Sequence, residues 1–155
     1  MRPGPSPIQS LAASLAQALS TDGQSRLPEL SRFDDLAEDM QAGRVSLRSL
    51  FEQALPAGSR RVLIVCDQFE ELFTLCQEGE ERSAFLDLLS ADANSGEPAG
   101  WLTVLITLRA DFMGQLLSHR SMADAFQGST GVLGPMNQDE LESAIVQPAR
   151  AQDVQ

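Results

Sequence analysis

The chain has 155 residues, the length of one domain, and its 43% hydrophobic content is enough to form a single buried core. Its formal net charge of −11 at pH 7 argues against a protein that binds nucleic acid or an anionic membrane surface. All eleven basic residues are arginines, so chemistry that needs a lysine ammonium is excluded from this sequence.

The first third of the chain is predicted to be helical. Apolar residues recur at steps of three and four over residues 6–20, which predicts an amphipathic helix. The stretch 27–55 has the same spacing on both sides of Gly43, so we expect two further helices there. The Pro-Ala-Gly-Ser sequence at 56–59 predicts a turn.

Two apolar runs in the middle of the chain predict strands. Val62–Cys66 is apolar throughout, without alternation, which indicates a strand buried on both faces, as in parallel sheets. Helical spacing over residues 69–76 predicts a helix almost directly after it, and a second helix is expected around 84–89. After a predicted loop at 94–98, the β-branched run 101–107 predicts a second buried strand.

The last third is predicted to begin with short helices at 112–117 and 122–126. A short third strand is expected at 131–134 and a final helix at 137–149. Asn137 is suited to cap this helix while Glu140 reaches back to the cap N–H, a variant of the capping box. Strands separated by helices predict an α/β fold, in which ligands bind outside the carboxyl ends of the strands.

The cysteines and the histidine predict no metal cluster. Cys66 and Cys76 lie among apolar residues and are expected to be buried thiols, and the sequence has one histidine to join them. That residue, His119, is expected at an exposed helix end rather than in a catalytic site. No apolar run is long enough for a signal peptide or a membrane span, so we expect a soluble, cytoplasmic protein.

Acidic residues follow the first predicted strand. Asp67 comes directly after it, at a position where nucleotide-binding proteins use a carboxylate to hold Mg²⁺. Glu70 is the preferred candidate to orient an attacking water, because it flanks the apolar stripe of the next helix. Glu71 is better explained as a first-turn acid that complements the helix dipole, an explanation that also remains open for Glu70.

Arg109 follows the second predicted strand and forms part of the same candidate site. Its planar guanidinium is suited to contact the γ-phosphate of a nucleotide at two points. The alternative is a structural ion pair with Asp111 or with the acids after the first strand, because such pairs imitate functional ones.

Three segments together resemble the novel STAND NTPase family of the nSTAND1 type. They are DQFEELFT at 67–74, TLRADF at 107–112, and LGPMN at 133–137 with Glu-Leu at 140–141 and Pro-Ala at 148–149. The resemblance implies a signal-transducing ATPase of the P-loop class, found in bacterial proteins ahead of WD40 repeats. The implied fold is an incomplete P-loop NTPase (STAND/AAA-like) parallel sheet with flanking helices.

The resemblance also implies roles for individual residues. Asp67 matches the Walker B metal acid, Glu70 or Glu71 the catalytic acid after it, and Arg109 the sensor at the end of the next strand. Pro135 resembles a proline motif near the nucleotide base, although a turn residue before the Asn137 cap is an equal explanation. The implied cofactors are ATP and Mg²⁺.

One family motif, the phosphate-binding loop G-x-x-x-x-G-K-[ST], does not occur in this sequence. We therefore expect residues 1–155 to be a single partial STAND NTPase domain that lacks the N-terminal Walker A strand and loop. The implied partners are that missing P-loop segment and a C-terminal WD40-like sensor region. An unpaired strand edge also predicts a marginally stable chain that self-associates.

Two functions remain open from the sequence. The first is a fragment of an ATP-binding and ATP-hydrolysing STAND signal-transduction switch, inactive as this chain alone. The second is a non-catalytic interaction or regulatory module that has lost nucleotide binding. The presence of Asp67, Glu70 and Arg109 favours the first, because an interaction module has no physical need for that set. A hydrolase with Asp67 and Glu70 as an acid/base pair is disfavoured, because no activated nucleophile is near them in the sequence.

Overall fold

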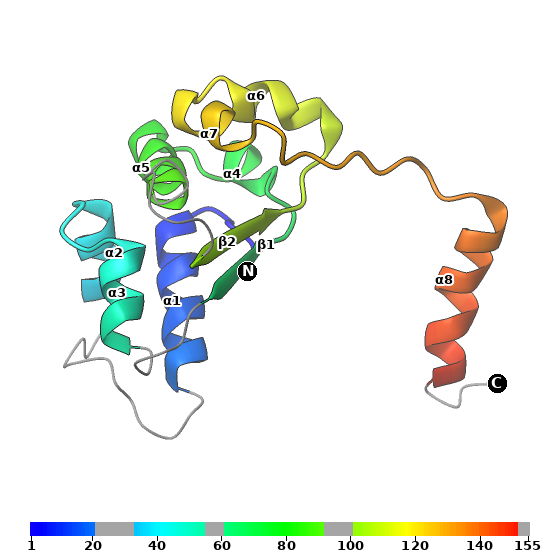
Figure 1. Ribbon diagram of the computed structural model, residues 1–155, viewed down its shortest axis with the longest axis horizontal. Coiled ribbons are helices and arrows are strands. Elements are labelled where there is room, and N and C mark those ends of the chain that lie inside the picture. Colours follow the sequence, from blue (N-terminus) through cyan, green and yellow to red (C-terminus); the bar gives the residue numbers. More distant parts are fainter. Residues whose placement is uncertain (21–32, 55–60, 92–100, 152–155) are drawn as a thin grey trace.

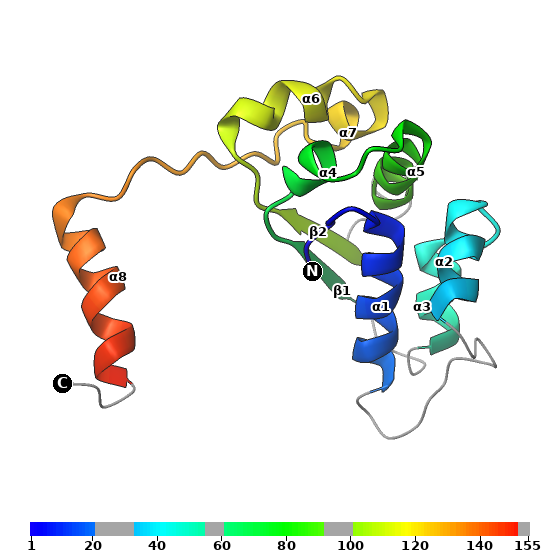
Figure 2. The same cartoon turned by 180° about the vertical axis from the view of Figure 1, so that it is seen from behind.

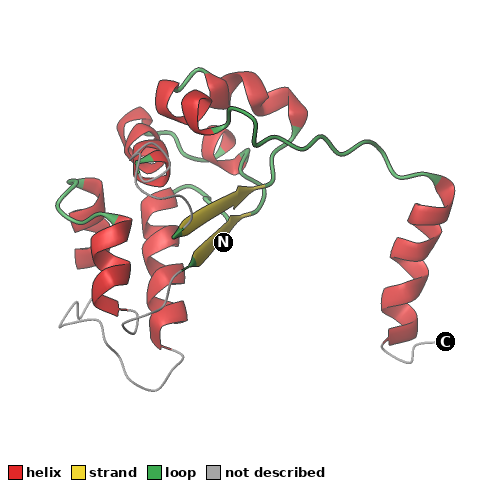
Figure 3. Cartoon of the chain, viewed as in Figure 1, coloured by secondary structure: helices red, strands yellow, loops and turns green. Residues whose placement is uncertain are grey.

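The computed structural model describes residues 1–20, 33–54, 61–91 and 101–151. Along these residues helices outnumber strands, as Figure 3 shows. The elements in chain order are α1 (Pro7–Ser20), α2 (Phe33–Gln41), α3 (Leu47–Ala54), β1 (Val62–Cys66), α4 (Glu71–Thr74), α5 (Gly79–Ser90), β2 (Leu102–Ile106), the 3₁₀ turn η1 (Ala110–Phe112), α6 (Met113–Leu117), α7 (Arg120–Ala125) and α8 (Gln138–Ala151). The turn predicted at 56–59 and the loop predicted at 94–98 lie outside the described residues.

Strands β1 and β2 form a parallel pair, as the two apolar runs predicted. The register runs from Val62 opposite Leu102 to Cys66 opposite Ile106, so both strands end at the same edge of the sheet. Met1 lies along the other side of β1, where its amine donates to the Val65 carbonyl at 2.7 Å and its carbonyl accepts from the Asp67 N–H at 2.9 Å. The α/β class is confirmed, with two strands assigned in the described part of the chain.

The core lies between one face of this strand pair and the helices beside it. Helix α1 packs against α2 and α5, and α2 also contacts α5 (Figure 1). The largest side chains of this core are almost completely buried: Ile8, Leu11, Leu36, Leu47, Phe69, Leu72, Phe85 and Leu116. The apolar stripes that predicted the helices thus face a common interior.

Trp101 closes the core at the amino end of β2. Its ring meets Phe51 of α3 edge to face, with 5.9 Å between the ring centroids, and the Arg48 guanidinium lies 5.1 Å from its centroid. These contacts join α3 to the sheet at the end remote from the carboxyl edge.

The opposite face of the strand pair is open, which corrects the prediction of strands buried on both faces. Leu63 is 61% exposed, Val65 40% and Leu105 52%, whereas Ile64 and Cys66 are buried. A strand without alternation of apolar and polar residues does not reveal whether one or both of its faces are covered. Here the described helices cover one face of the strand pair.

The prediction of a third strand at 131–134 is wrong for this structure. The segment has no strand partner, and Val132 and Leu133 are among the most exposed apolar residues. Helix α8 begins at Gln138, and Asn137 caps it as predicted: its side chain accepts from the Glu140 N–H at 2.9 Å, while Glu140 accepts from the Asn137 N–H at 2.8 Å. Both views show α8 at the end of this extended segment, away from the other helices (Figures 1 and 2).

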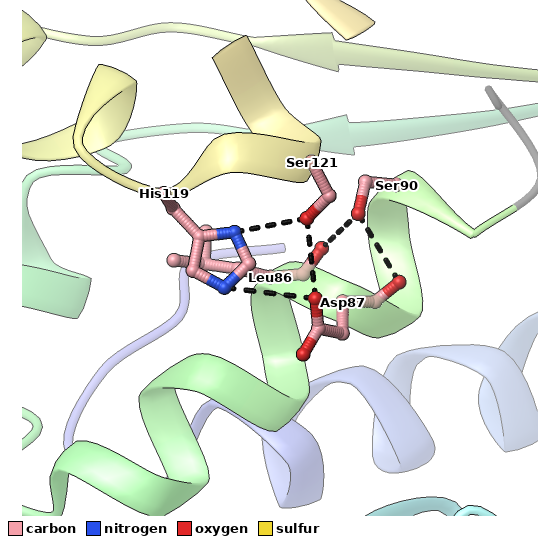
Figure 4. A network of polar contacts seen from close by, with 5 residues as sticks. All are labelled: Leu86, Asp87, Ser90, His119 and Ser121. Atoms are coloured by element: carbon pink, nitrogen blue, oxygen red, sulfur yellow. Dashed lines mark hydrogen bonds and ion pairs between the residues drawn. The ribbon is translucent and has the colours of Figure 1, made fainter. Parts of the chain in front are cut away.

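Helix α7 is held against α5 by a polar cluster around His119, drawn in Figure 4. Ser121 donates to Asp87 at 3.1 Å and lies 3.0 Å from the Nδ1 atom of His119, whose Nε2 atom is 3.6 Å from Asp87. The side chain of His119 is 21% exposed, so the prediction of an exposed helix end is wrong. His119 precedes the first turn of α7, where it links two helices.

Two further expectations concern membranes and metals. Among the described helices, none has the length and apolar content that crossing a bilayer requires. Cys66 and Cys76 are buried free cysteines, as expected. The described side chains form no cluster of three or more His, Cys, Asp or Glu residues suited to hold a metal ion on their own.

Candidate functional site

The carboxyl edge of the strand pair brings Asp67 and Thr107 together. Each residue directly follows a strand, and the register places the ends of the strands opposite each other. The Thr107 hydroxyl donates to Oδ1 of Asp67 at 2.6 Å and accepts from the Gln68 N–H at 3.0 Å. The backbone continues this connection, because the Phe69 N–H donates to the Thr107 carbonyl at 2.9 Å. The hydroxyl thereby fixes the orientation of the Asp67 carboxylate.

The Asp67 carboxylate is exposed and favours its ionised form. The hydrogen bond from Thr107 lowers the pKa of Asp67 most, and the backbone N–H of Gln68 and the charge of Arg2 lower it further. Partial desolvation opposes these effects without reversing them. An oriented, ionised carboxylate at a strand end is suited to hold a divalent cation or one of its water ligands.

The turn after Asp67 positions the two glutamates. Gln68 has a φ of 53°, the left-handed conformation that residues other than glycine seldom adopt. This turn ends strand β1 and directs Phe69 into the core, where it is fully buried. Glu70 and Glu71 follow at the start of α4, and both are half-buried. The helix is shorter than predicted, spanning Glu71–Thr74 rather than residues 69–76.

The guanidinium of Arg109 pairs with a carboxylate two residues along the chain. Its Nη2 and Nε atoms lie 2.8 and 3.2 Å from the two carboxylate oxygens of Asp111, a bidentate pair with both side chains more than half exposed. Its Cζ atom lies 5.8 Å from the centroid of the Phe112 ring. Of the two explanations that the sequence left open, the structure contains the ion pair with Asp111. Contact between Arg109 and a phosphate would require exchange of this partner.

A row of aromatic rings connects Arg109 to the core. Phe112 stacks on Phe73 at 6.2 Å between centroids, Phe73 meets Phe69 at 6.4 Å, and Phe69 stacks on Phe85 at 6.0 Å. Phe69 and Phe85 are fully buried. The carboxyl edge of the sheet therefore rests on a packed aromatic support.

Pro135 is the one predicted site residue that the structure places away from this edge. It is exposed, in the extended segment that leads to α8 (Figure 1). Asp67 and Thr107 thus share one end of the sheet with Glu70, Glu71 and Arg109, which follow the same two strands within a few residues.

Thr107 is the functional candidate that the sequence reasoning missed. Its signal was present, because Thr107 directly follows the second apolar run just as Asp67 follows the first. Parallel pairing of two runs of similar length makes the residues after them neighbours. A hydroxyl at that place is suited to bond the acid on the adjacent strand.

The residues at this edge fit a metal ion that arrives with its nucleotide. Mg²⁺ is held by one or two carboxylates together with phosphate oxygens and water, which agrees with one oriented aspartate and no larger acidic cluster among the described side chains. For the phosphates the fit is incomplete, because the sequence has no lysine and Arg109 is paired with Asp111.

A test of the Thr107 contact is the substitution Thr107→Val, which removes the hydroxyl at constant shape. We expect the pKa of Asp67 to rise toward its ordinary value, because the largest cause of its lowering is lost. A carboxylate whose pKa is lower in the folded state than in the unfolded state stabilises the protein at pH values above the unfolded-state pKa. This stabilisation is lost as the pH falls through the folded-state pKa. NMR titration of the side-chain carboxyl carbon measures the shift.

The matched control is Thr103→Val, the same change at an exposed position of β2. It is expected to leave the titration of Asp67 unchanged. An unaltered pKa of Asp67 in Thr107→Val would contradict the role given to the hydroxyl.

Comparison with known proteins identifies a family. No curated protein and no solved structure matches the chain. The family model Novel STAND NTPase 1 matches residues 1–155 of the chain. The chain therefore belongs to the Novel STAND NTPase 1 family.

Proposed function

We propose that this chain carries the metal-binding and sensor half of the nucleotide site of an ATP-dependent STAND switch. The observation that supports it best is the Asp67 carboxylate, oriented by Thr107 at 2.6 Å and held in its ionised form at the carboxyl edge of a parallel sheet. Membership of an NTPase family supports the use of a nucleotide and a metal in general.

In this proposal Asp67 is the Walker B acid that holds Mg²⁺ directly or through water. Glu70, with Glu71 as the alternative, orients the attacking water. Arg109 leaves Asp111 to contact the γ-phosphate. Pro135 approaches the base after a movement of the exposed segment 129–137, which here holds it away from this edge. The bound metal ion would neutralise charge on the phosphates, and the side chains of this chain position it and the water.

The remaining half of the site is proposed to come from a P-loop segment that precedes residues 1–155 in the parent protein. The backbone amides and lysine of such a loop supply the phosphate contacts that this sequence lacks. We also propose a WD40-like sensor region after the domain and a cytoplasmic location for the whole switch.

Nucleotide binding by residues 1–155 alone is expected to be weak. Without a phosphate-binding loop the contacts that remain are one carboxylate with its metal and one arginine already in an ion pair. We expect a dissociation constant for Mg²⁺–ATP of about 1 mM or weaker, near the 4 kcal/mol that such few contacts provide. Isothermal titration calorimetry measures it, and saturable micromolar binding would contradict the proposal.

The decisive experiment is to read the coding DNA upstream of residue 1. An in-frame G-x-x-x-x-G-K-[ST] motif within about one hundred codons supports the switch, and the longer chain should then bind and hydrolyse ATP. A stop codon directly upstream would favour a free-standing interaction module. The observation that favours this second candidate is the exposed apolar face of Leu63, Val65 and Leu105.

A further inference from the structure

Two apolar surfaces of this chain lie uncovered. The first, here called the open face, consists of Leu63 and Val65 of β1 with Leu105 of β2, and all three are 40% exposed or more. Register pairs Val65 with Leu105, so these two side chains are neighbours across the strands. The open face is apolar apart from Thr103, which pairs with Leu63, and α/β folds cover such a face with a helix.

The second surface is a stripe along α8, here called the α8 stripe. It consists of Leu141, Ala144, Ile145 and Pro148, which follow each other at steps of three, one and three residues on one side of the helix. Ile145 is 72% exposed and Leu141 49%, and no residue of α8 is buried. An amphipathic helix gains most of its stability by burying such a stripe.

The segment between these surfaces keeps α8 away from its own sheet. Residues 129–137 form no helix or strand, and all are exposed. Both views show this segment running outward from the α6 and α7 region, with α8 beyond it (Figures 1 and 2). Gly134 and Pro135 favour an extended path, because proline restricts itself and the residue before it.

We propose that a second copy of this chain covers the open face with its α8, and that the exchange is reciprocal. One copy offers its α8 stripe to the sheet of the other and receives the partner's helix on its own sheet. Exchange of an identical element through an extended connection is a low-cost route to a two-fold dimer. This inference does not depend on nucleotide binding.

The apolar area available agrees with what a stable dimer needs. The open face and the α8 stripe expose five large apolar side chains: Leu63, Val65, Leu105, Leu141 and Ile145. The connecting segment 129–137 exposes three more: Val132, Leu133 and Met136. Full burial removes on the order of 100 Å² per side chain, so the open face and the α8 stripe give roughly 500 Å² in two copies, and packing of the two connecting segments in the dimer raises this to roughly 1,000 Å². A standard interface buries about 1,600 Å², of which slightly more than half is apolar.

Charge complementarity agrees with the same arrangement. The first turns of α8 carry Asp139, Glu140 and Glu142. On the sheet, exposed Arg61 precedes β1, and Arg2 lies near its other end, where its charge acts on Asp67. The carboxyl end of the sheet also carries the acids Asp67, Glu70 and Glu71, so the favoured direction places the acidic start of α8 toward Arg61 and Arg150, in its last turn, toward those acids.

The test is sedimentation equilibrium of the full chain and its variants. We expect a dimer for the unchanged chain, and a dissociation constant raised about 100-fold or more by Ile145→Glu or by Leu63→Glu, because each dimer contains the substitution twice. The control Ser143→Glu adds the same charge on the other side of α8 and should leave the dimer intact. Both substituted residues are largely exposed, and far-UV circular dichroism verifies that each variant is folded.

Mixing the two disrupting variants distinguishes exchange from nonspecific association. A chain with Ile145→Glu retains an intact sheet, and a chain with Leu63→Glu retains an intact α8. The mixed dimer has one intact interface and one interface that carries both substitutions. Because one glutamate is expected to abolish the contact that it enters, a second in the same contact costs little more, and we expect the mixture to associate about tenfold more tightly than either variant alone. Without this restoration, reciprocal exchange of α8 is overturned.

Other results also overturn the proposal. A dimer that survives Ile145→Glu uses another surface. A monomer with a radius of gyration near 15 Å, the value of a compact domain of this length, covers the open face with its own α8. A larger monomer in the same small-angle X-ray scattering measurement leaves the open face without a helix from this chain.

Discussion

The substitution Asp67→Asn is expected to lower the turnover number for ATP hydrolysis about 100-fold or more in a chain that also carries the proposed phosphate-binding loop. The amide keeps the shape and still accepts the hydrogen bond from Thr107. It removes the negative charge that would attract Mg²⁺, so the metal would be bound weakly at the position where charge develops during phosphoryl transfer. Steady-state hydrolysis at varied Mg²⁺ concentration measures the effect.

The control for this prediction is Glu80→Gln, which removes one charge from an exposed site at the start of α5. Its activity should equal that of the unchanged chain. Glu70→Gln should lower the turnover number while leaving Mg²⁺–ATP affinity nearly unchanged, because a water-orienting group acts after binding. Full activity of Asp67→Asn would disprove the Walker B assignment.

The substitution Phe69→Ala is expected to reduce the free energy of unfolding by about 3–5 kcal/mol. Phe69 is fully buried and forms the middle of the aromatic row, between Phe73 and Phe85. Truncation leaves a cavity and removes two ring contacts at once. Because single domains have about 5–15 kcal/mol in total, this loss leaves little stability. Urea unfolding followed by far-UV circular dichroism measures it.

Leu75→Ala is the comparison for this prediction, because Leu75 lies on the same segment but is 46% exposed. It should reduce stability by about 1 kcal/mol or less, as the truncated side chain is already partly in water. Phe69→Leu retains most of the volume and should fall between the two. Equal losses for Phe69→Ala and Leu75→Ala would show that Phe69 does not support the core as the structure indicates.

The local structure could be predicted from the sequence where the signal is carried by neighbouring residues. The capping interaction of Asn137 with Glu140 was predictable, because both partners lie within one helical turn. The position of Asp67 at a strand end was equally predictable, because the apolar run Val62–Cys66 stops directly before it.

Features that depend on distant partners could not be predicted in the same way. The run at 131–134 has the residues of a strand, but strand formation requires a paired edge, and the segment has none in the described structure. Likewise, the two apolar runs do not reveal that one of their faces is open. The ion pair of Arg109 with Asp111 depends on side-chain geometry. From the sequence alone, Asp111 and the acids after the first strand were equally possible partners.

The packing of Trp101 has a practical consequence for spectroscopy. Trp101 is the sole tryptophan of the sequence. It directly precedes β2, and Thr107 directly follows β2, so about 20 Å of strand separates the indole from the candidate site. Its fluorescence emission therefore depends on the contacts with Phe51 and Arg48 rather than on an occupant of the carboxyl edge. Emission from this residue thus serves as an internal standard for the folded state during ligand titrations at the other end of the sheet.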